Sequence, residues 1–552
     1  MGPLGALCWL WSATEAVLMV TQPFLAPSPA WICAVTPCLL LPALRPSLSS
    51  LTLAILARLA MHAAQAPFVW DSCYWCALSD AGILVAAACA TARHGADPER
   101  RDALAVEMIS LAMRWQMAIF YFAAGFWKLN TAFLDPTHSC ATLVVVQLIA
   151  YWLPPALTPL PLVRLLAHAA PLKVIAGEVA IAPLLLGGHA RLRQLAILLV
   201  LLLHAGICLT PFPNQIPTFS VVCLSRVLFA AAPHTCAAAI NEAVQLPSTT
   251  AGIAWRSVAV ATIALAASCN TNPAFVVNWS IPYYALLGCL SVLVLARFDE
   301  SRGSSAADLA AWRGPWARLP LAALLGVTAF CAFGLQILGV MDGVASPFSS
   351  LRLHGGSNHL LLPTSLLQPS LGGDVVRVEA STSTYLNSLY PADITSKIDP
   401  RSREMLLAVG HTARQYNPTV RRVVGEELRA YMPRWQPDSS SPFIKYTMPA
   451  MELRRVLWEA RERNESFSIE YSRLPGGQGD ETWRSSSSTA RVKLVENAHG
   501  KRICKVITGL WSSPCAEDEV ALAPPLSAWQ RRVMLFFPHA IEPGAAQLPC
   551  AD

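Results

Sequence analysis

Residues 114–130, RWQMAIFYFAAGFWKLN, combine ionisable side chains with an apolar run that is nearly long enough to cross a membrane. In such a run a lysine amine is held in a medium of low dielectric constant, where it loses its proton more readily than in water. Lys128 could therefore act as a base toward an apolar substrate, and Gly125 would let a second helix approach closely. The side chains that share one face at helical spacing are Arg114, Ala118, Tyr121, Gly125 and Lys128.

The depth of the two cations in a membrane leaves two alternatives open. On a helix rising ~1.5 Å per residue, Arg114 and Lys128 lie ~21 Å apart, which is less than the ~30 Å hydrocarbon thickness. Either both side chains extend to opposite membrane interfaces, or at least one lies below the headgroups, where an ionisable residue is a candidate for function.

Two further polar residues interrupt apolar runs. Glu178 lies within KVIAGEVAIAPLLLGG and needs a partner or a proton, so we expect it to pair with Lys173, Lys128 or Arg114. The pair would be structural, or it would act directly in catalysis or transport. His204, in LLVLLLHAGICL, is either a hydrogen-bonded core residue or a functional one, and no His or Cys follows it at metal-ligand spacing.

The other candidate motifs are weaker. Cys73-Tyr-Trp-Cys76 has redox spacing, but it borders a membrane helix, so redox use, a lumenal disulfide and inert packing all remain open. His354, His359 and His411 have no acidic or cysteine ligand nearby, and no metal site is predicted. The sequence contains no P-loop, nucleophile elbow, zinc-protease or EF-hand pattern.

Composition divides the chain into two regions. Its mean hydropathy is +0.43 and only 14% of its residues are charged, against ~25% in soluble proteins. The charged residues are sparse before residue 340 and dense after it. We therefore expect a multi-pass membrane domain over 1–340 and a hydrophilic domain over 341–552. The net charge of +6 is dispersed, which argues against nucleic acid as a partner.

The apolar segments predict eight to eleven membrane spans. Residues 30–44 and 153–161 are rich in proline, so we expect kinked, re-entrant or interfacial structure there. The segments are 5–25, 30–44, 49–67, 79–92, 104–128, 141–163, 173–188, 192–210, 214–233, 253–269, 281–297 and 319–340.

The C-terminal domain is expected on the lumenal or outer side of the membrane. The arginine-rich loop 297–318 favours the cytosol, so the next helix would carry the chain across. Two glycosylation sequons, Asn278-Trp-Ser and Asn464-Glu-Ser, agree with that orientation. We therefore expect a glycoprotein of the endoplasmic reticulum or another secretory membrane, in which Cys504 and Cys515 could be bridged.

Within this domain the periodicity predicts an α+β fold. Residues 375–379, 467–472 and 491–508 alternate as half-buried strands do, with a turn at 497–500. Residues 403–413, 418–431 and 449–463 have helical periodicity. The sequence thus predicts a polytopic α-helical membrane bundle followed by a soluble, β-rich exoplasmic domain.

Three membrane segments resemble, in order, the vitamin K-dependent gamma-carboxylase family and its wider relatives, the horizontally transferred transmembrane domain proteins. They are FVWDSCYWCALSDAGILVA (68–86), QMAIFYFAAGFWKLN (116–130) and AGEVAIAPLLLGGHARLRQLAILLVLLLHAGICLTPFPNQIP (176–217). The most specific piece is Tyr-Phe-x-Ala-Gly-x-x-Lys-Leu, and the resemblance covers about residues 50–235. Where the carboxylases have a histidine-containing run after the tryptophan, this chain has Asp71-Ser72-Cys73-Tyr74.

The resemblance implies a function for the polar residues. In the carboxylases the lysine of this motif deprotonates reduced vitamin K, and the oxygenated quinol takes a proton from a substrate glutamate, which then adds carbon dioxide. By this likeness Lys128, Glu178 and His204 are the catalytic candidates, and Tyr121 and Gly125 would contact a reduced, vitamin K-like quinone. Membrane lipid and a lumenal protein or peptide would be the partners.

Two functions thus remain open. One is a carboxylase-like enzyme that uses a lipophilic quinol or related lipid. The other is a non-enzymatic membrane protein that binds or transports a lipid or small molecule through the same buried charges. A transporter is expected to show inverted repeats, and none is visible in the sequence.

Overall fold

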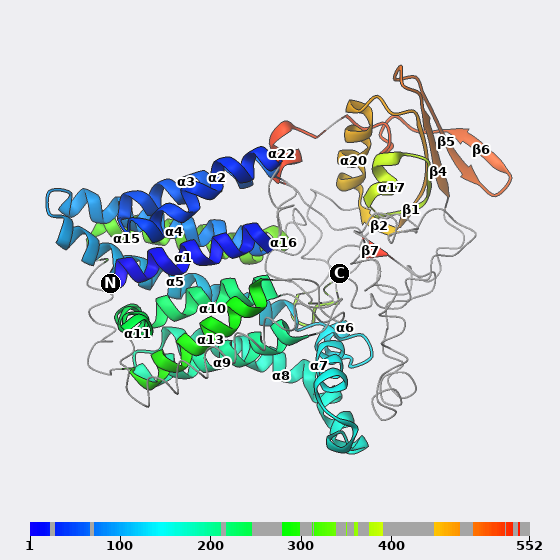
Figure 1. The fold of residues 1–552 in the computed structure, drawn as a ribbon. Helices are drawn as coiled ribbons and strands as arrows, with labels where there is room; N and C mark the ends of the chain where they lie inside the picture. The colour runs from blue at the N-terminus through cyan, green and yellow to red at the C-terminus, as the bar shows by residue number, and fades with distance from the viewer. Residues whose placement is uncertain are drawn as a thin grey trace.

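The computed structural model has two parts, a helical bundle and an antiparallel sheet with helices (Figure 1). It describes residues 1–21, 28–66, 71–210, 217–245, 279–298, 312, 314–337, 349, 351, 358–362, 375–389, 446–474, 490–524, 526–533 and 539–540.

Within these residues, six helices are long and apolar enough to cross a membrane. The pair α10 and α11, bent by 111° at a short break, would make a seventh. The predicted segment 253–269 lies outside the described residues, so the expected eight to eleven spans stay a prediction. The six helices are α1 (Pro3–Thr21), α4 (Asp71–His94), α5 (Pro98–Trp127), α8 (Leu160–Leu186), α9 (Ala190–Leu209) and the run Ala317–Ile337, which comprises most of α15 (Pro315–Ala329) with η4 (Phe330–Gly334) and α16 (Leu335–Ile337).

Shorter helices complete the described bundle. Two of them, α2 and α13, are apolar, and α2 is one helix with Pro37 and Pro42 inside it. The kinked, re-entrant or interfacial structure expected for 30–44 stays a prediction. The shorter helices are α2 (Pro29–Leu44), α3 (Leu48–Gln65), α6 (Thr131–Leu134), α7 (Cys140–Trp152), η2 (Pro155–Leu157), α10 (Pro217–Ala231), α11 (Pro233–Gln245) and α13 (Ser280–Ala296).

The apolar segments 141–163 and 173–188 do not coincide with single helices, as the prolines of 153–161 led us to expect for the first of them. The first segment holds α7, the short turn η2 and the start of α8, because Pro154 and Pro155 break the chain there. The second is the end of α8, which runs through Pro171 and Pro183 without interruption. As a result Glu178 lies in the last third of one long helix.

Helix α5 packs against α4, α8 and α10 and is the element around which the bundle is arranged. It begins earlier than the apolar pattern indicated, because Asp97 caps it by accepting a hydrogen bond from Arg100 N–H and Pro98 occupies its first turn. Nearly every residue from Ala105 to Trp127 is buried. Trp115 and Phe122 are exposed on one face of α5, and the other faces can present polar groups to several neighbours at once.

The C-terminal part is a seven-stranded antiparallel sheet in the order β6-β5-β4-β3-β1-β2-β7. Helix α20 (Ala450–Glu462) packs against β1 and β2, and α17 (Thr384–Leu389) packs against α20. A last short helix, α22 (Ala528–Val533), precedes β7. The strands are β1 (Val375–Ser381), β2 (Tyr446–Pro449), β3 (Phe467–Leu474), β4 (Arg491–Glu496), β5 (Arg502–Thr508), β6 (Trp511–Pro514) and β7 (His539–Ala540).

Several predictions for this part are confirmed. The strands over 375–379 and 467–472 exist, and 491–508 is the hairpin β4–β5, whose turn lies at 497–500 with Gly500 at φ +76°. The predicted helix 449–463 is α20. The predicted helices 403–413 and 418–431 lie outside the described residues.

The packing of α20 against the sheet can be tested by a substitution in the interior of the domain. Leu457 of α20 is 0% exposed, and we expect Leu457→Ala to lower the free energy of unfolding by about 2–5 kcal/mol through lost contacts and a cavity. Hydrogen exchange of the full-length protein, followed in peptides of β3, measures the change. Leu510→Ala is the control, because Leu510 is 102% exposed. Equal effects of the two substitutions would contradict the packing described here.

Candidate functional site

The close contact between α5 and α8 is centred on Gly125. A Cβ atom at this position would lie 2.6 Å from Val179 Cγ2 and 3.4 Å from Glu178 Cβ. Only a residue without a side chain lets α8 come this near. The expectation that Gly125 admits a neighbouring helix is confirmed, and the neighbour is the helix that carries Glu178.

This contact brings Lys128 and Glu178 together. The Lys128 ammonium nitrogen Nζ lies 3.0 Å from each of the two carboxylate oxygens of Glu178, and it also donates to Ala124 O at 3.4 Å. Lys128 is 5% exposed and Glu178 is 8% exposed. Of the three cations considered as partners of Glu178, the structure selects Lys128. Arg114 is buried in the bundle as well. The depth of the two cations in a membrane stays a prediction.

A second polar pair lies on the same face of α5. The hydroxyl of Tyr121 and Nε2 of His204, on α9, are 2.8 Å apart and both side chains are buried. The His204 ring also packs against Phe219 of α10, with 5.3 Å between ring centroids. His204 is therefore hydrogen-bonded, and its partner lies two helical turns before Lys128.

The arrangement brings the predicted residues Lys128, Glu178, His204, Tyr121 and Gly125 to one side of α5. An amine, a carboxylate, an imidazole and a phenol can each give or take a proton. Among the residues that the structure describes, no group of three or more His, Cys, Asp or Glu side chains could hold a metal ion. The chemistry that these contacts can support is acid–base chemistry.

Sequence reasoning missed a second buried charge cluster, formed by Glu15, Arg58, Asp80 and Arg226. Arg58 Nε lies 2.7 Å from Glu15 and its Nη1 lies 2.5 Å from Asp80, while Arg226 Nη2 is 3.6 Å from Glu15 and 4.0 Å from Asp80. Trp11 Nε1 donates to Asp80 at 2.9 Å. The cluster joins α1, α3, α4 and α10. Glu15, Arg58 and Arg226 are each the one Asp, Glu, Lys or Arg residue of their helix, and Asp80 lies in the apolar middle of α4. The same signal singled out Glu178 and could have found this cluster.

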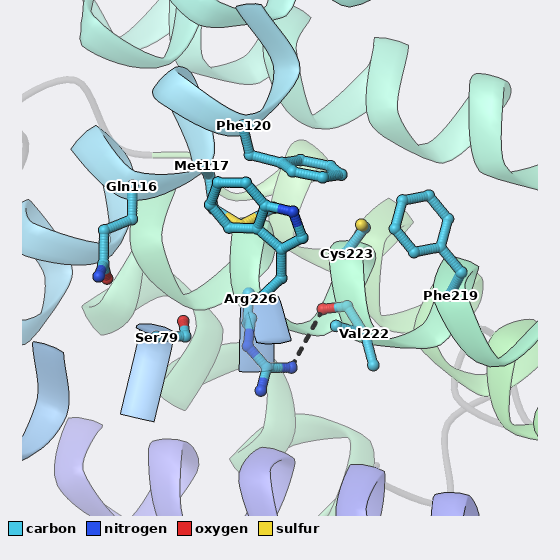
Figure 2. Close-up of a pocket in the computed structure, with 9 residues that line it drawn as sticks. Ser79, Gln116, Met117, Phe120, Phe219, Val222, Cys223 and Arg226 are labelled. Carbon is cyan, nitrogen blue, oxygen red and sulfur yellow. Dashed lines mark hydrogen bonds between the residues drawn. The ribbon is translucent and has the colours of Figure 1, made fainter. Parts of the chain in front are cut away.

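A cavity of about 10 Å³ adjoins this cluster, enough for about one water molecule. Figure 2 shows its lining, in which Phe120 and Phe219 face Cys223 and the Arg226 guanidinium donates to Val222 O at 3.5 Å. Three buried atoms of the lining residues, Ser79 Oγ, Gln116 Oε1 and Arg226 Nη2, have no hydrogen-bond partner among the residues that the structure describes. The surface that opens into the cavity is almost wholly apolar, so the cavity offers little to hold a polar ligand.

The cysteine predictions have different outcomes. Cys73 and Cys76 are buried on α4 and are not joined to each other by a disulfide, which favours inert packing. Cys504 on β5 and Cys515, just after β6, form a disulfide.

Of the three histidines of the C-terminal region, His354 and His411 lie outside the described residues. His359 Nε2 contacts Phe126 O at the end of α5, 2.9 Å away. Burial lowers the pKa of His359, so its neutral ring is the favoured form in this contact.

The charge cluster gives a stability test. Arg58→Met would leave two buried carboxylates with only the distant Arg226, and we expect a loss of about 3–5 kcal/mol. The midpoint of thermal unfolding of the detergent-solubilised protein measures it. The control is Arg100→Met, which removes an exposed pair with Asp97 at 3.3 Å and should change stability by about 0–1 kcal/mol. An Arg58 variant as stable as the control would show that the cluster is not required for folding.

Comparison with known proteins adds one finding. A family model described as a domain of unknown function (DUF8388) matches residues 357–532, which include nearly all of the sheet and helix α20. The match covers less than half of the chain. No curated protein and no solved structure matches the sequence.

Proposed function

We propose that the membrane bundle is a carboxylase-like enzyme that acts with a lipophilic quinol or a related lipid, with Lys128, Glu178 and His204 as its acid–base groups. The observation that carries this proposal is the buried contact between Lys128 and Glu178. It lies in the two segments whose sequences resemble the gamma-carboxylase family most closely.

The geometry supports a role in proton exchange. Before Lys128 Nζ can accept a proton, the ammonium must give one away, and the hydrogen bond to Glu178 at 3.0 Å provides a direct acceptor. In a medium of low dielectric constant, two charges are penalised relative to a neutral amine and carboxylic acid. The pair can therefore move a proton between Nζ and a carboxylate oxygen without creating net charge.

The cofactor implied by the resemblance is a reduced quinone, and the described residues do not cradle one. Val179 fills the space beside Gly125, and the Tyr121 hydroxyl is bonded to His204. The cavity beside Phe120 has the volume of about one water. We therefore assign no step to the quinol and base the proposal on the proton exchange of Lys128 and Glu178.

The buried contact between Lys128 and Glu178 also fits a second candidate, a non-enzymatic membrane protein that binds or transports a lipid or small molecule. Tight packing around Gly125 is what a charge pair with a structural role would also show. Turnover distinguishes the two candidates.

The catalytic proposal predicts an activity. Microsomes that contain the protein should incorporate labelled carbon dioxide into a glutamate peptide when reduced vitamin K is supplied, and Lys128→Met should lower the rate by about 10²-fold or more. Lys173→Met is the control, because this lysine is exposed on α8 and lies outside the site. If the unsubstituted protein incorporates no label, the enzyme proposal fails and the second candidate stands.

We also propose that the C-terminal domain faces the lumen of the endoplasmic reticulum or of another secretory compartment. Asn464 is exposed at the turn after α20, so its sequon is accessible to glycosylation. The disulfide between Cys504 and Cys515 supports an oxidising environment.

This orientation predicts that a glycosidase will increase the gel mobility of the protein from microsomes. Asn464→Gln should remove one step of the shift, because the acceptor nitrogen is lost. Asn497→Gln, also exposed but outside a sequon, should leave the shift unchanged. If the glycosidase does not alter the gel mobility of the wild-type protein, the proposal of a lumenal domain is contradicted.

A further inference from the structure

Asn130, two residues after Lys128, is a buried hub of hydrogen bonds with 0% exposure. Its Nδ2 donates to Trp127 O and to Ser349 O, each at 2.8 Å. Its Oδ1 accepts from Phe133 N–H at 2.8 Å and from Asn358 Nδ2 at 3.4 Å. One side chain thus joins the last turn of α5, the start of α6 and two residues far along the chain.

Two of these bonds act on the surroundings of Lys128. The carbonyl of Trp127 precedes Lys128 directly, so the first bond fixes the peptide from which the lysine side chain extends. The bond to Phe133 caps α6 and holds the Phe133 ring 5.8 Å from Lys128 Nζ. A ring at this distance attracts a cation.

Residues 358–362 lie against the same turn as a short antiparallel segment. Thr131 N–H donates to Asn358 O at 3.0 Å, and Leu360 N–H donates to Leu129 O at 2.9 Å. Asn130 and His359 pair as an antiparallel β-bridge between these two segments of the chain. The His359 ring packs 4.6 Å from the Phe126 ring and 5.6 Å from the Trp127 ring. The residues on both sides of Lys128 are therefore bonded to this segment.

We propose that Asn130 is a positioning residue that holds Lys128 against Glu178, and that residues 358–362 form the wall of the site at the end of α5. Because the DUF8388 match begins at residue 357, this wall is the first part of the C-terminal region that the family model covers. The positioning role of Asn130 rests on the proposed function of Lys128. The contacts do not, and the test below needs no turnover.

The test measures how fast a water-soluble, amine-reactive ester labels Lys128 in the full-length protein, with each lysine read by mass spectrometry. Asn130→Ala should raise the labelling rate of Lys128 at least about tenfold, as expected when two or more buried hydrogen bonds are lost. Lys505, which is exposed on β5, is the internal standard. Asn130→Ser keeps a good cap for α6 and should restore part of the protection.

Alkylation of the buried Cys223 separates positioning from general loosening of the bundle. Labelling of Lys128 that rises while Cys223 stays protected supports the proposal. Unchanged labelling of Lys128, or an equal rise at both residues, overturns it. If Asn130→Ala does not fold, His359→Ala takes its place. This substitution removes the contact with Phe126 O and two ring contacts. The labelling of Lys128 and Cys223 is then measured and judged by the same criteria.

Discussion

Burial of the Lys128–Glu178 pair is the constraint on which the proposed site depends. Neither charge can remain alone among apolar helices, because an unpaired buried ion costs several kcal/mol. The pair exists only because Gly125 lets α8 reach α5, and its neighbour Phe133 is in place only because Asn130 starts a new helix immediately after α5. A single backbone contact between two helices thus determines which groups meet at the end of α5.

The bundle holds its two sets of buried charges in chemically different ways. The cluster around Arg58 uses guanidinium groups, which do not give up a proton in proteins. Its formal charges balance, and it can join four helices without taking part in proton exchange. The pair at the end of α5 uses a lysine, whose amine can be neutral. This difference, rather than the number of charges, favours the pair as the reactive site.

Sequence reasoning identified the buried polar residues of the candidate site better than their contacts. Lone polar residues in apolar runs identified Glu178 and His204, and the spacing of α5 placed Tyr121 and Lys128 on one face. The pairing of Tyr121 with His204 could not be predicted, because it depends on how α9 packs against α5. Asn130 carried no signal, since an asparagine after a helix is common and its four contacts come partly from residues far along the chain.

For the fold as well, elements with a local sequence pattern were predicted and features that depend on packing were not. Strand alternation identified β1, β3, β4 and β5, and helical period identified α20, because these patterns are local. The proline-rich stretch 153–161 was expected to interrupt a helix, and it separates α7 from α8, whereas Pro171 and Pro183 lie inside the unbroken α8. Which prolines break a helix depends on the packing around each of them.

The four-helix charge cluster has a consequence for biosynthesis. Glu15 belongs to the first helix, whereas Arg226 is synthesised only after most of the bundle has left the ribosome. Until then the growing chain holds Glu15, Arg58 and Asp80 and lacks the second guanidinium of the cluster, so two carboxylates share one cation. The cluster is therefore complete only when α10 joins α1, α3 and α4, so the early helices cannot reach their final charge pairing one by one.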